Sequence, residues 1–482
     1  MNKETQKKAI IIAVIVLAAV VFGIWQYQRY YERTFITIQD TDYRRDSANL
    51  DFSGQTSLEI EKLKELTALE TLNLQNTGIT LEQYDALHAA LPACDINWSV
   101  PFQGGYVNSG ISELTLEALS EADLDILAYL PELRTLNAKA CTDYPEIMAL
   151  IERYPDISVS YNVEIGGRAY SHTVQKLSIS DPDADELMER LAYLPNVHTV
   201  DLTGELPANE ALLKLQQAYP GITFVFDLEI FGVAVNTMDE FIDLSGIRFS
   251  STEEIDAVIP HFYNLAQIDM LDCGISNDDM DALNKRYRDI KIVWRVYVCG
   301  VPLRTDALHF MPYQYNCSGV SAAACYNLRY CTDMQVLDFG HYGIGNVDFV
   351  EHMPNLKCLL MCEAAVSDLS AIGNCISLVY IELQMSPNVS NFWPLTNLTN
   401  LRDLNLSDVA YVDSSPLLQM TWLDRLWVVK NNLGATTRAM LQEALPNTII
   451  VFQSSGHTTS GFRYTPYYYV QRDILGMYYK CN

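Results

Sequence analysis

Six polar and aromatic side chains near the carboxyl terminus recur in three pairs, with a spacing suited to a recognition surface. Each pair takes alternate positions of a short apolar run, and successive pairs are 23 and 22 residues apart. Alternate residues of a strand point to one face, so pairs on neighbouring strands would lie side by side. Aromatic rings and an arginine beside carboxylates are typical interface anchors, whereas a merely solvated sheet face is the alternative interpretation. The predicted binding residues are Tyr380, Glu382, Asp403, Asn405, Arg425 and Trp427.

The residue pattern gives little support for a catalytic site or a metal site. The eight histidines are scattered, and none stands in a recognised signature with a nucleophile and a carboxylate. The acidic run at Asp181–Glu186 suggests a calcium loop, but it lacks the turn glycine at the sixth position and has Ala192 where a glutamate is needed. We interpret this run, and Asn277–Asp281, as acidic helix starts. No catalytic residue, metal or cofactor is therefore predicted.

Eleven cysteines would normally predict disulfides in an exported protein. Cys141 and Cys273 stand at repeat positions where a small buried thiol packs against the backbone. Cys358 and Cys362 lie too far apart along one strand to bond to each other. If a bridge forms, the sequence favours one cluster for it, formed by Cys317, Cys325 and Cys331.

The elements that must position these side chains are repeats. Five units near the carboxyl terminus begin 22, 22, 23 and 22 residues apart, at Met334, Leu356, Leu378, Leu401 and Leu423. Each unit places further apolar residues three and five positions later. This alternation predicts a short strand in every unit, with every second side chain directed inward.

The same pattern recurs upstream at longer intervals of 64, 64 and 68 residues, where a second repeat fills the gap. That repeat is an alternating apolar run with an aromatic residue at its centre, at Trp98, Tyr161, Phe226 and Trp294. Six residues later comes a glycine, at Gly104, Gly167, Gly232 and Gly300. A glycine between two such runs is typical of a β-hairpin turn. Each upstream module is therefore predicted to hold two strand-and-helix units and one hairpin.

The LxxLxL units resemble the leucine-rich repeat family, particularly the 22-residue bacterial type of internalin-like surface proteins. The resemblance extends over roughly residues 47–452. It implies an α/β fold: a solenoid with a curved parallel sheet, helices or turns on its convex side, and here periodic β-hairpin insertions. The predicted binding residues would then lie on the concave face.

One position departs from the family pattern. The family usually places Asn, Cys or Thr three residues after the last strand leucine, where the side chain satisfies buried backbone groups. Thr77, Cys141, Cys273 and Asn431 follow this pattern in the sequence, whereas Tyr342 and Ala364 do not. An interrupted ladder, with altered curvature, is therefore expected between Met334 and Leu406.

A membrane anchor is predicted at the amino terminus. Residues 9–25 carry neither charge nor proline, and at about 1.5 Å per residue they span roughly 25 Å, near the short limit for a bilayer. Lys7 and Lys8 precede this stretch and aromatic residues follow it. The positive charges before it predict a single-pass signal anchor in the cell membrane, with the amino terminus cytoplasmic and the repeats outside.

This organisation predicts seven segments along the chain. They are a cytoplasmic tail (1–8), a transmembrane signal anchor (9–28), a juxtamembrane linker (29–46), repeat modules (47–310), an irregular Cys-containing connector (311–333), regular 22-residue units (334–452) and an aromatic C-terminal cap (453–482). The last segment is expected to cover the open edge of the repeats.

Charge limits the classes of partner. Sixty acidic and 32 basic residues give a net charge of -28, which repels phosphate backbones and argues against nucleic acid. The expected function is a membrane-anchored, surface-exposed and non-catalytic protein that binds a protein or a glycan. An envelope scaffold without a single ligand, and a subunit of an enzyme complex, are the alternatives.

Overall fold

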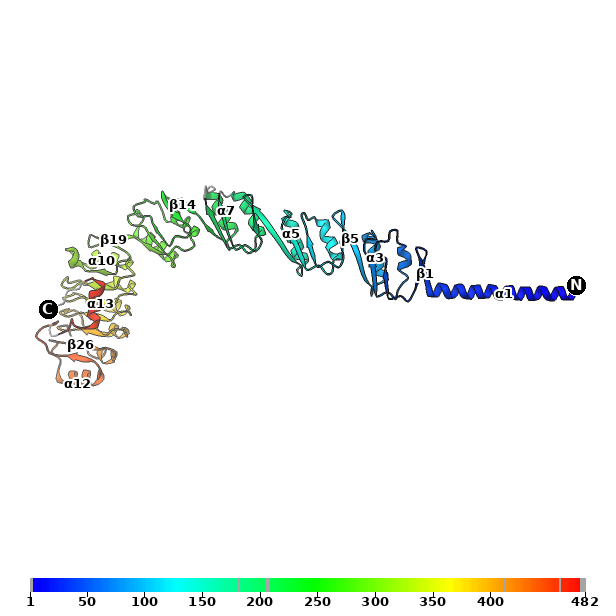
Figure 1. Ribbon diagram of the computed structural model, residues 1–482. Helices are drawn as coiled ribbons and strands as arrows, with labels where there is room; N and C mark the ends of the chain where they lie inside the picture. Colours follow the sequence, from blue (N-terminus) through cyan, green and yellow to red (C-terminus); the bar gives the residue numbers. More distant parts are fainter. Residues whose placement is uncertain (1–2, 181–182, 204–208, 411–412, 459–460, 477–482) are drawn as a thin grey trace. The chain divides into compact units, whose positions relative to one another are not determined.

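The computed structural model describes residues 3–180, 183–203, 209–410, 413–458 and 461–476. It divides into two compact units, Met1–Phe224 and Val225–Asn482, and each is described by itself. Both are built from short strands joined by helices and turns (Figure 1).

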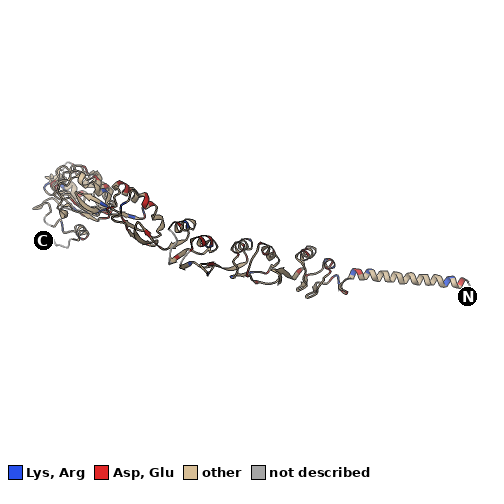
Figure 2. Cartoon of the chain, turned by 90° about the horizontal axis from the view of Figure 1, so that it is seen from above, with Lys and Arg blue, Asp and Glu red and all other residues tan. Residues whose placement is uncertain are grey.

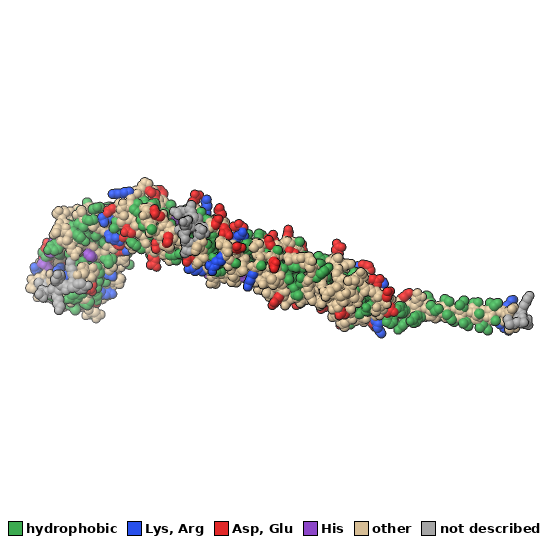
Figure 3. All heavy atoms as spheres, turned by 45° about the horizontal axis from the view of Figure 1, so that its top comes forward, with side chains coloured by type: hydrophobic (Ala, Val, Ile, Leu, Met, Phe, Trp, Pro, Cys, Tyr) green, Lys and Arg blue, Asp and Glu red, His purple; other side chains and the backbone are tan. Residues whose placement is uncertain are grey.

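The first unit begins with α1 (Lys3–Thr34), a helix whose apolar side chains are exposed. It is long and apolar enough to cross a membrane over Glu4–Thr34, judged by length and composition. Hydrophobic side chains cover the face of its central part seen in Figure 3, and charged residues lie only towards its two ends (Figure 2).

The segment expected as a juxtamembrane linker is folded. Its residues form the end of α1 and an antiparallel hairpin of β1 (Phe35–Ile38) and β2 (Thr41–Arg44). The Arg45 amide donates to the Thr34 carbonyl at 2.9 Å, and its guanidinium donates to the Glu32 carbonyl at 2.9 Å. The alternating residues of β1 bury two isoleucines, so the hairpin extends the folded body to the end of α1.

Two complete modules follow in this unit. The strands of the first are β3 (Asn49–Asp51), β4 (Thr71–Leu74), β5 (Asp95–Phe102) and β6 (Gly105–Asn108), with helices α2 (Ile60–Leu63) and α3 (Leu81–Ala90). The second has β7 (Glu113–Thr115), β8 (Thr135–Ala138), β9 (Ser158–Ile165) and β10 (Arg168–Ser171), with α4 (Glu121–Ile126), η1 (Leu127–Tyr129) and α5 (Tyr144–Arg153).

The predicted hairpins form, and in the first two modules each one continues a repeat strand. The first half of β5 pairs in parallel with β4, and its second half, from Ser99 to Phe102, pairs antiparallel with β6. Strand β9 changes partner in the same way, from β8 to β10, after Tyr161. One long strand therefore belongs both to the parallel repeat and to the hairpin.

The same hydrogen bond marks this change of partner in all four modules. The amide of the central aromatic residue meets a side chain eleven positions later, and the pairs are Trp98–Ser109, Tyr161–His172, Phe226–Thr237 and Trp294–Thr305. The amide of that later residue donates back to the aromatic carbonyl at 2.9–3.1 Å. The central aromatic side chains are buried. These paired bonds close the base of each hairpin.

The third module completes the first unit. Its elements there are β11 (Lys176–Ser180), α6 (Ala184–Arg190), η2 (Leu191–Tyr193), β12 (Thr199–Thr203), α7 (Asn209–Ala218) and β13 (Thr223–Val225). Asp183 caps α6 by accepting the amides of Asp185 and Glu186, which confirms the helix-start interpretation. Asp181 and Pro182 lie outside the described residues.

The second unit opens with a hairpin and a fourth module. The elements are β14 (Asp227–Ile230), β15 (Val233–Asn236), β16 (Phe241–Asp243), α8 (Glu253–Asp256), η3 (Ile259–His261), β17 (Gln267–Asp269), α9 (Asn277–Arg286), β18 (Lys291–Val293), β19 (Arg295–Val298) and β20 (Val301–Arg304). Ser276 caps α9, so the acidic residues near 277–281 also open a helix, as expected.

A seven-stranded parallel sheet forms the rest of this unit. Its strands are β21 (His309–Phe310), β22 (Val336–Asp338), β23 (Cys358–Leu360), β24 (Tyr380–Glu382), β25 (Asp403–Asn405), β26 (Arg425–Trp427) and β27 (Ile449–Val451). Helices join them: η4 (Pro312–Tyr315), α10 (Ala322–Cys325), η5 (Tyr326–Tyr330), η6 (Asp348–His352), α11 (Ser370–Gly373), η7 (Trp393–Asn397), η8 (Leu417–Gln419) and α12 (Ala435–Ala444). The expected connector at 311–333 thus supplies helices between β21 and β22.

Apolar residues are buried on both faces of this sheet. Leu337, Leu359 and the equivalent leucines and isoleucines of later strands pack into the main core with the helices. On the opposite face, a second apolar cluster joins strand residues to Phe462, Tyr468 and Leu475 from the carboxyl terminus. The last helix, α13 (Pro466–Ile474), lies across the strands in Figure 1 and contacts β23. The segment predicted to cap the edge of the repeats thus covers a face of the sheet.

Candidate functional site

The six predicted binding residues lie together on one face of the sheet, which we call the strand face. Strands β24, β25 and β26 pair in register, which aligns Tyr380, Asp403 and Arg425 in one row and their partners in a second row. Five of the six side chains are at most 1% exposed, and only Arg425 is partly accessible. The predicted grouping is therefore observed, but the expected open surface is not.

The carboxyl-terminal segment covers these residues. We call the described part of residues 453–476 the strap. Thr465 caps α13, and Tyr468, Gln471 and Leu475 recur on the buried side of that helix. Phe462 packs edge-on against Trp427, with ring centroids 5.2 Å apart. A ligand would have to displace the strap before it reached these six residues.

Glu382 joins the strand face to the strap. Its carboxylate accepts two bonds from the Arg463 guanidinium, at 3.0 and 2.7 Å. The Tyr380 hydroxyl donates to it at 2.6 Å and the Gln384 amide at 2.8 Å. Burial raises the pKa of Tyr380 well above its usual value, and the adjacent carboxylate adds to this rise. Glu382 is thus fully partnered inside the protein.

Asp403 forms a second link. Arg425 donates to both of its oxygens at 2.9 Å, and the Thr465 hydroxyl donates at 2.8 Å. The same guanidinium donates to the strap carbonyls of Gly461, at 2.9 Å, and of Phe462. Burial raises the pKa of Asp403, although the Arg425 charge opposes the rise. Arg425 therefore belongs to the packing of the strap rather than to an open interface.

The fit of the strap is incomplete. Asn405 does have a partner in the strap, because its side-chain amide donates to the His457 carbonyl at 2.9 Å. Other buried polar atoms of the described chain do not. The Trp427 indole nitrogen and the side-chain oxygens of Gln384 and Gln471 are buried without a hydrogen-bond partner among the described residues. A buried polar atom left without a partner costs about 1–3 kcal/mol. These three atoms weaken the hold of the strap on the sheet.

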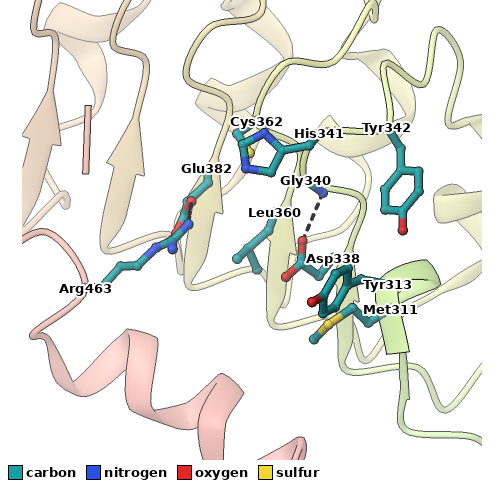
Figure 4. A pocket seen from close by; sticks show the side chains of 10 residues that line it. All are labelled: Met311, Tyr313, Asp338, Gly340, His341, Tyr342, Leu360, Cys362, Glu382 and Arg463. Atoms are coloured by element: carbon teal, nitrogen blue, oxygen red, sulfur yellow. Dashed lines mark hydrogen bonds and ion pairs between the residues drawn. The ribbon is translucent and has the colours of Figure 1, made fainter. Parts of the chain in front are cut away.

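An open pocket of about 460 Å³ remains on the strand face beside the strap. Figure 4 shows Asp338 at its centre, with Tyr313 on one side and, beyond Leu360, the Glu382–Arg463 pair on the other. Asp338, Leu360 and Glu382 occupy the same register position on β22, β23 and β24. The strap covers the strand face up to this pocket and supplies Arg463 to its wall.

Asp338 differs from the other two carboxylates. One of its oxygens accepts the Gly340 amide at 2.9 Å, and no ion pair links it to a described cation. Burial raises the pKa of Asp338 and outweighs the opposing bond from the Gly340 amide. The nearby Glu382 carboxylate adds to the rise, and Arg463 and His341 oppose it with smaller effects. The pocket thus holds one acidic group whose charge no protein cation directly neutralises.

The pocket also contains a cysteine and a histidine, which raises the question of nucleophilic chemistry. These two residues are joined by a backbone bond, from the His341 amide to the Cys362 carbonyl at 2.9 Å. The His341 ring is exposed and pairs with Glu363 at 3.2 Å. Burial raises the pKa of Cys362 to about 11, so the thiol stays protonated and weakly nucleophilic at neutral pH. This arrangement favours binding over catalysis.

Hydrogen bonds between successive repeats identify the fold. Asn431 donates to the Leu406 carbonyl at 2.6 Å and accepts the Val409 amide at 3.1 Å, both in the preceding repeat. Ser386 makes the equivalent bonds, to the Met361 carbonyl and from the Ala364 amide. A polar ladder therefore joins parallel strands that recur every 22 or 23 residues. The chain has the leucine-rich repeat fold.

The predicted ladder interruption does not break the leucine-rich repeat sheet. Tyr342 and Ala364 stand at ladder positions, yet β22, β23 and β24 pair without a gap. Backbone hydrogen bonds connect the neighbouring repeats here. The Phe339 amide donates to the Leu360 carbonyl at 2.8 Å, and the Met361 amide donates to the Glu382 carbonyl at 2.7 Å. Side-chain ladder bonds reinforce the leucine-rich repeat stack but are not needed at every turn.

Comparisons with known proteins give fold-level similarity. No protein-family model matches the chain, and no curated protein matches it. An internalin, InlF, from Listeria monocytogenes is 15% identical, with 87% of this chain and 85% of that chain covered and a TM-score of 0.24. A leucine-rich repeat protein of Leptospira interrogans, LIC12759, is 14% identical over 85% and 90%, with a TM-score of 0.28. Because these TM-scores are low, the leucine-rich repeat assignment rests on the register of the strands and on the polar ladder.

Of the residues that line the open pocket, Glu382 alone was predicted as a binding residue. Asp338 stands at the same strand position as Glu382, so its place on the strand face was predictable, but its lack of a cation was not. Arg463 lies 81 residues from Glu382. The i, i+3, i+7 spacing of Tyr468, Gln471 and Leu475 was the available signal for a helix with one buried side.

The predicted cysteine cluster does not form as expected, and a different pair is favoured for oxidation. The Cys325 thiol lies 3.3 Å from that of Cys299, and the Cys299 amide donates to the Ala324 carbonyl at 2.8 Å. Cys331 is buried elsewhere, with its thiol 3.8 Å from the Arg304 carbonyl. In the described residues all ten cysteines are free, and no group of three or more His, Cys, Asp or Glu side chains is placed to hold a metal.

We expect oxidised glutathione to join Cys299 and Cys325 by thiol–disulfide exchange, with release of two molecules of reduced glutathione. The disulfide would close the loop between Cys299 and Cys325, which should stabilise the second unit by on the order of 3–4 kcal/mol. Peptide mapping after alkylation should find the linked peptides, whereas Cys375, which is buried in the core, should remain a free thiol. A Cys299→Ser variant that gains the same stability on oxidation would contradict the pairing.

Proposed function

We propose that this protein is a non-catalytic, membrane-anchored binding protein, with its repeats outside the cell and a protein as its partner. The observation that carries the proposal is the open pocket on the strand face. The strap stops covering the sheet at this pocket, beside Asp338, a carboxylate that no described cation pairs with. Helix α1 supports the anchor through its length, composition and exposure. The prevailing negative charge supports a partner that is not a nucleic acid.

Catalysis by the pocket is disfavoured by the state of its carboxylates. Acid–base catalysis with two carboxyl groups requires one of them to receive or donate a proton while the other remains available. Glu382 is instead held by Arg463, Tyr380 and Gln384. Asp338 therefore lacks a free carboxylate partner in the pocket, which leaves binding as the better supported role.

Photocrosslinking in intact cells tests the proposal. A benzoylphenylalanine replacing Tyr313, which is 77% exposed at the pocket rim, should form a discrete adduct of higher mass. The same residue at Tyr297, 56% exposed on the β19 hairpin strand, is the matched control and should give little adduct. External protease should digest the repeats and the adduct without lysis of the cells.

Four outcomes would overturn parts of this proposal. Equal adducts at both positions would favour a scaffold without a defined site, and an adduct whose added mass is removed by a glycosidase would identify a glycan partner. Protection of the adduct from external protease would place the repeats on the other side of the membrane. No adduct at Tyr313 would reject the pocket as the binding site.

A further inference from the structure

The strand face carries three carboxylates, and the protein neutralises only two of them directly. Asp403 is paired with Arg425 and Glu382 with Arg463, each through two bonds to a guanidinium. Asp338 accepts a single backbone amide bond and forms no ion pair with the described cations. The third carboxylate thus lies on the same face as two guanidinium-paired carboxylates but has no guanidinium of its own.

The surroundings of Asp338 suit a cation carried on an aliphatic stem. Met311 and Leu360 give the pocket apolar surface, on which the methylene groups of a long basic side chain can pack. Tyr313 and Tyr342 line the same pocket, and tyrosine rings attract a guanidinium through their faces. The volume of about 460 Å³ leaves room for a side chain together with its backbone.

The electrostatics favour a cation over an anion. Ionising a partly buried carboxylate costs free energy, and an incoming positive charge offsets that cost. The raised pKa of Asp338 agrees with this cost. An anionic ligand would instead face the charge of Asp338, while the nearest guanidinium, Arg463, already makes two bonds to Glu382.

We propose that the pocket binds an arginine side chain from an extended segment of the protein partner, with its guanidinium on the Asp338 carboxylate. This inference rests on the proposed function and adds the chemistry of recognition to it. The Glu382–Arg463 pair, in the wall of the same pocket, shows the geometry that such a contact takes on this face. The strap then supplies one guanidinium to the strand face and the partner supplies the next.

The test uses the full chain in detergent micelles and measures the affinity of N-acetyl-L-arginine amide by calorimetry near neutral pH. Its neutral isostere, N-acetyl-L-citrulline amide, should bind at least about tenfold more weakly, because it lacks the charge. Asp338→Asn should lose a similar factor for the arginine probe. Asp348→Asn removes an exposed acid that accepts only an Asn346 bond in the described contacts, and should leave the affinity unchanged.

Retention of structure in Asp338→Asn is checked by amide hydrogen exchange of β22 and β23. Equal affinities for the arginine and citrulline probes, or an unchanged affinity in a folded Asp338→Asn, would overturn the inference. Tighter binding of free arginine than of the capped amide would overturn its assignment to a protein segment. If one of these results is obtained but the Tyr313 adduct still forms in Asp338→Asn, the inference fails and the proposed function stands. Absence of any Tyr313 adduct would reject the proposed function itself.

Discussion

Replacing Arg425 with methionine is expected to lower the free energy of unfolding of the second unit by about 3–5 kcal/mol, because the change leaves Asp403 buried without its cation. Both side chains are largely inaccessible, at 12% and 1% exposure. The variant also loses the guanidinium bonds to the strap carbonyls of Gly461 and Phe462. Urea unfolding followed by hydrogen exchange of the β25 and α13 amides would measure the loss.

The pH dependence of this effect follows from the sign of the Asp403 shift. Burial already holds the pKa of Asp403 above its ordinary value of 3.8, and loss of Arg425 raises it further. The folded variant then binds a proton more readily than its unfolded chain. Its deficit is therefore full near neutral pH and shrinks as the pH falls towards 3.8.

An exposed ion pair provides the control for this variant. Lys285 and Asp281 lie 2.6 Å apart, with the lysine side chain 71% exposed. Lys285→Met should change stability by at most about 0.5 kcal/mol. A similar loss in both variants would show that the buried pair has no special weight, and retention of β25 protection in Arg425→Met would contradict the role assigned to this contact.

Truncation of the chain after Gln453 should expose Cys358 to alkylation. Its thiol is buried on the strand face, 3.9 Å from the Tyr467 carbonyl, and burial raises its pKa from 9.0 to about 12. Removing the strap should return the thiol towards its ordinary pKa and open it to reagent. Because the thiolate is the reactive form, we expect the labelling rate to rise roughly a thousandfold.

Cys375 separates local exposure from general unfolding. It is equally buried, with a pKa raised to about 12, but it packs in the main core on the opposite side of the sheet. Peptide-resolved mass spectrometry should therefore find Cys358 labelled and Cys375 protected. Tyr468→Glu, which places a charge in the strap interface of a full-length chain, should act in the same direction. An unlabelled Cys358 in both variants would show that the strap does not cover it.

Local periodicity made the repeats predictable from the sequence. Apolar residues at fixed short spacing specify which side chains of each strand face the core, and the structure places Leu337, Leu359 and Ile381 there. The hairpins were predictable because a glycine and two alternating runs stand together in the chain. Parallel register then followed from the nearly constant repeat length.

The covering of the strand face was not predictable from periodicity. It depends on residues far apart in the sequence, such as Arg463 and Glu382, and the repeat pattern fixes only contacts between neighbouring turns. The aromatic residues of the strap predicted that this segment packs somewhere, but an open edge and an apolar sheet face satisfy the same requirement. The extra bonds from Arg425 and Glu382 to the strap favour the face.

The return of the strap also sets an order of events during biosynthesis. Cys358 meets Tyr467, which lies 109 positions later in the chain. At about 5–20 residues per second, β23 emerges roughly 5–20 seconds before its cover is made. During that interval apolar and aromatic residues of β23, and then of β24 and β26 as they are made, face water. A chain that ends prematurely keeps this surface open, so chaperones and proteases can distinguish it from a finished one.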